Sequence, residues 1–196
     1  MQLLEHFKEL TLHPKNVQEL KGLILQLAVQ GKLTKNWRKE NPEVEPASIL
    51  LKKIKAEKEL LIKEKKIKKE KPLPPVSEDE IPYELPEGWE WSRLGEYAHY
   101  GALSKFENRD ASRNTWVLEL EDIEKNSSKV LKKVRFRERN FKSTKSVFMK
   151  SDVIYGKLRP YLDKVIVADE KGVCTTEMIP IRSFSDSSAE YLRLFL

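Results

Sequence analysis

The chain has 196 residues, of which 35% are charged and 39% are hydrophobic, and its formal net charge is +6. This length allows one domain with an extension, or two small domains. Its apolar runs are too short to span a membrane, and the N-terminus has no secretory-signal pattern. One cysteine excludes an internal disulfide, and three scattered histidines give no zinc-site spacing. We therefore expect a cytoplasmic protein.

The first predicted helix has apolar residues at steps of three and four over residues 17–31. Pro14 suits the first turn of this helix, and Gly31 suits its C-terminal end. A polar loop bounded by prolines is then predicted over residues 36–46.

A second amphipathic helix, rich in lysine, is predicted over residues 47–71. Residues 52–71 hold ten Lys and four Glu, so this segment alone accounts for the +6 excess of the whole chain. Two interpretations stay open: a patch for nucleic acid, or a solvated helix face that binds nothing. Because isolated amphipathic helices cannot bury their apolar stripes, both helices need a neighbour.

Prolines then break the chain, and the pattern changes to short strands. The sequence predicts a helical region over residues 1–71, a proline-rich linker over 72–84 and a mixed α+β domain over 85–196. Strands are predicted over residues 90–94, 115–120, 130–136, 152–155, 164–168 and 175–182. A turn is expected at residues 169–172, and a helix starts at Ala189.

Signatures of catalysis are mostly missing. The sequence has no Gly-rich phosphate loop and no Asn/Asp-Pro-Pro-Tyr/Phe motif of base methylation. Asp152, Asp169 and Lys171 weakly match the spacing of a metal-dependent nuclease. The alternative is that Asp169 belongs to a hairpin turn, where Asp and Gly are favoured for backbone reasons.

Residues 129–145 carry the better functional signal, with eight bases and one acid. In a strand, Arg135, Arg137 and Arg139 share one face, and a row of guanidinium groups suits phosphates and base edges. The alternative is an exposed basic hairpin that binds nothing. The predicted DNA-binding residues in this segment are Arg135, Arg137, Lys142 and Lys145.

A second candidate lies at residues 155–161. Here Gly156 allows close approach of the backbone, and Lys157 and Arg159 point the same way if the segment is extended. The alternative is a packed turn with Arg159 in a structural ion pair.

Five pieces of the chain, taken together and in order, resemble the specificity (S) subunit of type I restriction-modification systems. They are residues 24–33 (ILQLAVQGKL), 45–58 (EPASILLKKIKAEK), 67–75 (IKKEKPLPP), 85–95 (LPEGWEWSRLG) and 152–162 (DVIYGKLRPYL).

The resemblance implies a non-catalytic subunit. Residues 17–71 would be a spacer that docks methyltransferase subunits, and residues 85–196 would be a target recognition domain for half of a bipartite DNA site. It implies no cofactor in this chain, while S-adenosylmethionine, ATP and Mg belong to partner subunits. The implied partners are double-stranded DNA, methyltransferase (M) subunits, the restriction (R) subunit and a second S chain, with no membrane. The predicted partner-binding residues are Leu20, Ile24, Leu27, Leu50, Ile54 and Leu61.

The sequence departs from this family in one respect. Full S subunits carry two recognition domains and two helical regions, whereas one of each is visible here, and we expect the recognition domain to be incomplete at its C-terminus. Either the chain is a half subunit that pairs with another chain, or it is a fragment whose helices bind partners without reading DNA.

Overall fold

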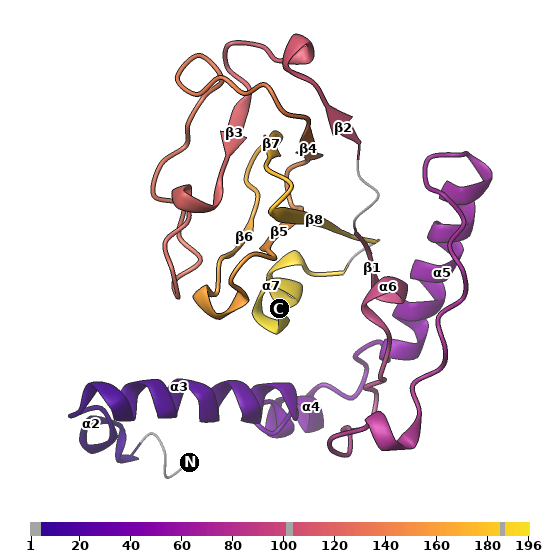
Figure 1. Ribbon diagram of the computed structural model, residues 1–196. Coiled ribbons are helices and arrows are strands. Elements are labelled where there is room, and N and C mark those ends of the chain that lie inside the picture. The colour runs from indigo at the N-terminus through magenta and orange to yellow at the C-terminus, as the bar shows by residue number, and fades with distance from the viewer. Residues whose placement is uncertain (1–4, 101–103, 185–186) are drawn as a thin grey trace. The chain divides into compact units, whose positions relative to one another are not determined.

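The structure is a computed structural model that describes residues 5–100, 104–184 and 187–196. Within these residues the chain forms helices and two four-stranded sheets, which confirms the predicted α+β class (Figure 1). Contacts divide the chain into two compact units, Met1–Leu50 with Val76–Trp91, and Leu51–Pro75 with Ser92–Leu196. These units alternate along the chain, whereas the sequence predicts consecutive segments.

The first unit contains α2 (Phe7–Leu10), α3 (Pro14–Val29), α4 (Lys35–Glu40) and the 3-10 turn η1 (Glu78–Glu80). The predicted limits of α3 are confirmed. Gly31 has a φ of +67°, its N–H donates to the Ala28 carbonyl, and the Lys32 N–H donates to the Leu27 carbonyl. This pattern is a Schellman motif, which glycine favours because it requires positive φ. The predicted loop at residues 36–46 is wrong in its first half, where α4 forms.

A turn at Pro86–Trp89 organises the end of the first unit. The Trp89 N–H donates to the Pro86 carbonyl, and Gly88 takes a φ of +81°, as a type II turn requires. The Gly88 carbonyl then accepts the Ala47 N–H at 2.8 Å. The strand predicted over residues 90–94 is wrong, because this segment stays irregular until α6 (Leu94–Tyr97) begins.

The lysine-rich helix α5 spans Ala47–Lys63 and ends eight residues before the predicted end at residue 71. Lys65 takes a φ of +58°, and the N–H groups of Lys65 and Lys66 donate to the carbonyls of Ile62 and Leu61. This second Schellman motif reverses the chain after the helix. Leu51–Pro75 therefore consists of most of α5 followed by an irregular segment, residues 64–75, that turns back after the helix. We call residues 64–75 the strap.

Two sheets form the second unit. The first has the order β1 (Ala98–Tyr100), β8 (Met178–Ser183), β5 (Val153–Gly156) and β6 (Val165–Val167), with every pair antiparallel. The second has the order β2 (Lys105–Phe106), β4 (Lys145–Phe148), β7 (Gly172–Cys174) and β3 (Trp116–Leu118). In the second sheet β3 and β7 run parallel. Short 3-10 turns lie between strands at η2 (Asn108–Asp110), η3 (Leu120–Asp122) and η4 (Pro160–Leu162).

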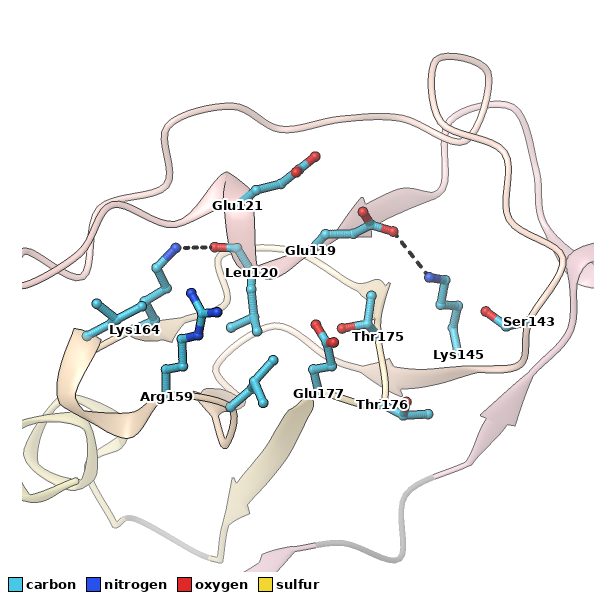
Figure 2. A pocket seen from close by; sticks show the side chains of 12 residues that line it. Glu119, Leu120, Glu121, Ser143, Lys145, Arg159, Lys164, Thr175, Thr176 and Glu177 are labelled. Atoms are coloured by element: carbon cyan, nitrogen blue, oxygen red, sulfur yellow. Dashed lines mark hydrogen bonds and ion pairs between the residues drawn. The ribbon is translucent and has the colours of Figure 1, made fainter.

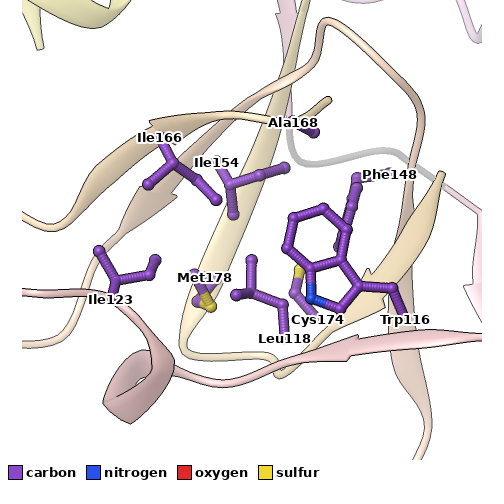
Figure 3. Packing of buried hydrophobic residues seen from close by; sticks show 9 residues of the cluster. All are labelled: Trp116, Leu118, Ile123, Phe148, Ile154, Ile166, Ala168, Cys174 and Met178. Carbon is purple, nitrogen blue, oxygen red and sulfur yellow. The ribbon is translucent and has the colours of Figure 1, made fainter. Parts of the chain in front are cut away.

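Alternating side chains place a core between the two sheets. In β5, Ile154 joins the central cluster around Trp116, and its neighbour Val153 points to the opposite face. That opposite face is covered by α7 (Ala189–Phe195) through the buried Leu192. Figure 3 shows the central cluster: Trp116, Leu118, Ile123, Phe148, Ile154, Ile166, Ala168, Cys174 and Met178. The Cys174 thiol lies inside this cluster, where burial raises its pKa to about 12.

The predicted strands over residues 115–120, 164–168 and 175–182 are confirmed as β3, β6 and β8 with shorter or shifted limits, the strand over 152–155 is confirmed as β5 shifted by one residue, and the C-terminal helix is confirmed as α7. The strand predicted over residues 130–136 is wrong. Only isolated bridges form there, at Val130 and Arg135, and a turn follows. The segment at residues 169–172 does not close a hairpin, because it connects strands of different sheets.

Candidate nucleic-acid interface

A cleft of about 470 Å³ opens in the second unit, where four segments from different parts of the chain meet (Figure 2). Residues 119–121 come from the end of β3, residues 143–145 lead into β4, and residues 158–164 and 175–177 follow β5 and β7. The polar side chains in this cleft carry both signs of charge and several hydroxyl groups. They are Glu119, Glu121, Ser143, Lys145, Arg159, Lys164, Thr175, Thr176 and Glu177.

Two of the basic side chains hold the walls of the cleft together. The Lys145 ammonium lies 3.3 Å from a Glu119 carboxylate oxygen and 5.4 Å from the centre of the Phe141 ring. The Lys164 ammonium donates to the Leu120 carbonyl at 2.6 Å. Figure 2 shows both contacts as dashed lines. These two lysines join β4 and β6 to the segment after β3, so their charges are already engaged.

Glu121 is paired with Arg139 at 2.9 Å, whereas Arg159 and Glu177 have no ion pair within the described part of the chain. Arg159 and Glu177 are exposed, and Figure 2 shows both side chains reaching toward the centre of the cleft. The hydroxyl of Thr175 is buried and has no hydrogen-bond partner among the described residues. An unsatisfied buried hydroxyl beside an unpaired cation and an unpaired anion indicates a place for a polar ligand.

The backbone holds Arg159 in an unusual conformation. Arg159 has a φ of +55° and Asp163 a φ of +47°, so the turn η4 is bounded at both ends by left-handed residues. Such residues cost of order 1–3 kcal/mol each and persist where surrounding contacts fix them. The strand before the turn lies close to the segment after it: the Gly156 N–H donates to the Lys164 carbonyl at 3.0 Å, and a Cβ at Gly156 would lie only 2.8 Å from the Leu120 side chain.

The predicted basic face at residues 135–139 does not form, because these residues make a turn instead of a strand. The Arg135 guanidinium donates to the Glu170 carboxylate at 2.9 Å and to the Asn114 carbonyl at 3.2 Å. Its neighbour Arg137 is exposed and has no ion pair within residues 104–184. Of the two arginines, only Arg137 has its charge available to a ligand.

The other predicted DNA-binding residues also fall into two groups: exposed residues without an ion pair, and a buried residue in an ion pair. Lys142, Lys157 and Arg159 are exposed, and none has an ion-pair partner among the described residues. Lys145 is 5% exposed and bound to Glu119. The structure thus brings Lys145 and Arg159 into one cleft and leaves Arg137 and Lys142 on the loop between β3 and β4.

Sequence reasoning did not find the ion-pair cluster around Arg139. Its guanidinium contacts Glu119, Glu121 and the buried Asp122, and these acids raise the pKa of Arg139. A second group joins Lys133 to Asp169 at 2.5 Å, which raises the pKa of Lys133 and lowers that of Asp169. A signal was present in the sequence, since an acidic run at residues 119–122 precedes the basic run at 129–145.

The residues of the nuclease hypothesis are held in separate contacts. The Asp152 carboxylate is 1% exposed, and both of its oxygens accept from the Arg182 guanidinium, at 2.8 and 2.7 Å. Asp169 pairs with Lys133, and Lys171 is exposed. Within the described ranges, no group of three or more His, Cys, Asp or Glu is placed to hold a metal ion.

The predicted partner-binding residues differ in exposure. Ile24 is 40% exposed, and Leu27, Leu50 and Leu61 are partly buried. Leu20 and Ile54 are buried within this chain, at 8% and 1% exposure. In the part of the chain that the structure covers, no helix is long and apolar enough to cross a membrane.

Comparison with known proteins gives a consistent set of relatives. The chain is 51% identical over 112 residues to the type I restriction enzyme EcoAI specificity subunit of Escherichia coli, covering 57% of this chain and 17% of that subunit. It is 31% identical over 174 residues to the EcoDI specificity subunit of the same organism, covering 89% of this chain and 34% of that subunit. The chain therefore spans about a third or less of the length of these relatives.

The chain was also compared with protein-family models and with solved structures. No protein-family model matches the chain. A crystal structure of the HsdS subunit from Thermoanaerobacter tengcongensis matches 57% of this chain and 29% of that chain, with 24% identity and a TM-score of 0.49. The curated matches confirm the resemblance to type I specificity subunits over part of their length.

Proposed function

We propose that this chain, which matches part of the type I restriction enzyme specificity subunits, is a non-catalytic DNA-recognition module of such an enzyme. It directs a partner methyltransferase and endonuclease to one half of a bipartite DNA site. Its partners are double-stranded DNA, M subunits, the R subunit through the complex, and a second S chain. S-adenosylmethionine, ATP and Mg are bound by the partner subunits, and this chain binds no cofactor.

The observation that carries this proposal is the mixed charge of the cleft. A surface that binds only phosphates would be uniformly basic, because carboxylates repel phosphate groups. Base edges in the major groove present both donors and acceptors: an arginine can donate to guanine O6 and N7, and a glutamate can accept from cytosine N4. Arg159 and Glu177 supply one group of each kind, and Thr176 and Ser143 supply hydroxyls. We propose these groups as readers of sequence.

Exposed basic residues outside the cleft have a different role in this proposal. Arg137, Lys142 and Lys157 contact phosphates and thereby set the position of the domain on the duplex. Arg135 and Lys145 support the fold, since their charges are engaged by Glu170 and Glu119. Substitution of Arg137 is therefore a cleaner test of DNA contact than substitution of Arg135.

The test is selection from a random duplex library at low salt by the purified chain, alone and with its methyltransferase. We expect enrichment of one short sequence. Loss of one bidentate base contact costs about 1–3 kcal/mol, so Arg159→Ala should lower preference for that sequence roughly 5- to 150-fold. Arg137→Ala should weaken binding to all sequences by a similar factor. Lys150→Ala, which changes an exposed lysine outside the cleft, is the matched control.

Two results would overturn the proposal. If the chain copurifies with a methyltransferase but enriches no sequence in either form, it is a fragment that binds partners without reading DNA. If Arg159→Ala and Glu177→Gln keep the full preference of the wild-type chain, sequence is read elsewhere and the cleft has another role.

A further inference from the structure

The lysine segment, residues 52–71, folds as part of the same compact unit as the two sheets. The Lys58 ammonium donates to the Gly95 carbonyl at 2.8 Å and lies 3.4 Å from the Glu70 carboxylate. The Arg93 guanidinium donates to the carbonyls of Pro74 and Pro75, at 3.1 and 3.0 Å. These contacts fix both α5 and the strap to residues 93–95, which precede the first strand of the sheets.

The arrangement also leaves most of the lysines in solvent. Nine of the ten lysines in the segment are exposed, and the exception is Lys58, which holds the strap in place. Lys66 pairs with Glu64 at 2.8 Å, and Lys53 also has an interaction partner. The other exposed lysines form no ion pair within the described residues: Lys52, Lys55, Lys63, Lys65, Lys68, Lys69 and Lys71. The charge excess of the chain is therefore concentrated on a surface fixed to the recognition domain.

We infer that the lysine segment is a second DNA-binding surface that contacts phosphates independently of sequence. The inference rests on the proposed function, which brings this unit to DNA. Lysine is depleted at protein–protein interfaces, and this favours DNA phosphates over an acidic protein as the ligand. Each ammonium group is a point charge on a flexible stem, which suits phosphates of any sequence. The segment adds affinity and leaves the choice of sequence to the cleft.

The strap offers a clean substitution because Lys68, Lys69 and Lys71 are exposed and lie outside any helix or strand. The triple variant K68Q/K69Q/K71Q removes three charges. The matched control is K21Q/K35Q/K39Q, which removes three exposed charges from helices α3 and α4. Circular dichroism of both variants should match that of the wild-type chain.

The measurement is fluorescence anisotropy with a 30-bp duplex of scrambled sequence, between 50 and 200 mM KCl. Each phosphate contact contributes about −0.9 to the slope of log K against log salt, so the strap variant should lose about 2 to 3 units of slope. The control variant should keep a slope close to that of the wild-type chain.

An unchanged slope in the strap variant would overturn the inference, and so would an equal loss in both variants, because net charge alone would then explain binding. Loss of copurification with an acidic methyltransferase, with DNA affinity intact, would assign the strap to a protein partner instead. Library selection keeps the two proposals apart. A chain that selects no sequence but loses slope in the strap variant would contradict the proposed function and support this inference.

Discussion

Gly172 lies where the Phe148 ring and the Trp116 backbone leave no room for a side chain. A Cβ built on Gly172 would lie 2.4 Å from the nearest ring carbon of Phe148 and 2.9 Å from the Trp116 carbonyl oxygen. Ordinary contacts between carbon atoms are about 3.5–4.0 Å, so Gly172→Ala must move the Phe148 ring by about an ångström. Both aromatic side chains are at most 1% exposed, and their rings meet edge to face at 5.1 Å.

The expected loss of stability follows from two opposing effects. Overpacking of a well-packed core costs about 1–3 kcal/mol, and replacing glycine by alanine in a strand recovers about 0.5–1 kcal/mol of backbone entropy. Gly172→Ala should therefore lower the free energy of unfolding by about 1–2 kcal/mol. With a typical dependence on urea, the midpoint should fall by roughly 0.5–1 M.

Urea unfolding followed by tryptophan fluorescence and circular dichroism measures this loss. Phe148→Leu alone should cost about 1–2 kcal/mol, and the double variant should cost less than the sum, because leucine leaves room for the new methyl group. Gly22→Ala is the matched control: nothing lies within 4 Å of a Cβ at this position in α3, so the helix should gain about 1 kcal/mol. Full stability of Gly172→Ala, or strict additivity with Phe148→Leu, would refute the reasoning.

Two further predictions concern charged groups. Arg139→Ala should lower the free energy of unfolding by about 3–5 kcal/mol, because it leaves the buried carboxylate of Asp122 without its ion-pair partner, whereas Arg137→Ala should change it by less than about 0.5 kcal/mol. Equal urea midpoints for the two variants would contradict this ranking. Burial lowers the pKa of His99 from its ordinary 6.5, so the unfolded chain takes up this proton at a higher pH than the folded chain, and stability is lost as pH falls below about 6.5. Urea midpoints between pH 8 and pH 5 should show this loss, and His99→Gln should reduce it; an identical pH dependence in the variant would exclude His99 as its source.

Elements with a strong local pattern could be predicted from the sequence. Helix α3 has its proline at the start and Gly31 after its end, and the strands β3, β5 and β6 consist mainly of branched or aromatic residues. Helix α5 was predicted too long because Lys, Glu and Ile continue to favour helix as far as residue 71. Its end at Lys63 depends on the contacts of the strap, in which Glu70 pairs with Lys58 and the Pro74 carbonyl accepts from Arg93, and these contacts cannot be read from the local sequence.

The candidate site could be predicted only in part. The segment at residues 155–161 was identified from its composition, and the structure places Arg159 in the cleft. The predicted row of DNA-binding arginines at residues 135–139 is wrong because a local sequence pattern does not show which acidic residues will pair with each arginine. Glu170 and Asp122 neutralise Arg135 and Arg139 from distant positions in the chain. Glu177 could not be predicted, because a single acidic residue forms no recognisable sequence pattern. Only the fold brings Glu177 into the same cleft as Arg159.

The position of Cys174 has a practical consequence for experiments in solution. It is the one cysteine of the sequence, and its thiol is enclosed by the core with a pKa of about 12, so it is a poor nucleophile at neutral pH. A probe attached through maleimide chemistry would therefore react only at a cysteine introduced by design. Lys39→Cys and Lys150→Cys would place a pair of spin labels or dyes on the two compact units, at exposed positions with no proposed role in DNA contact. Distance distributions between these labels, with and without DNA, would report how the units move as the complex forms.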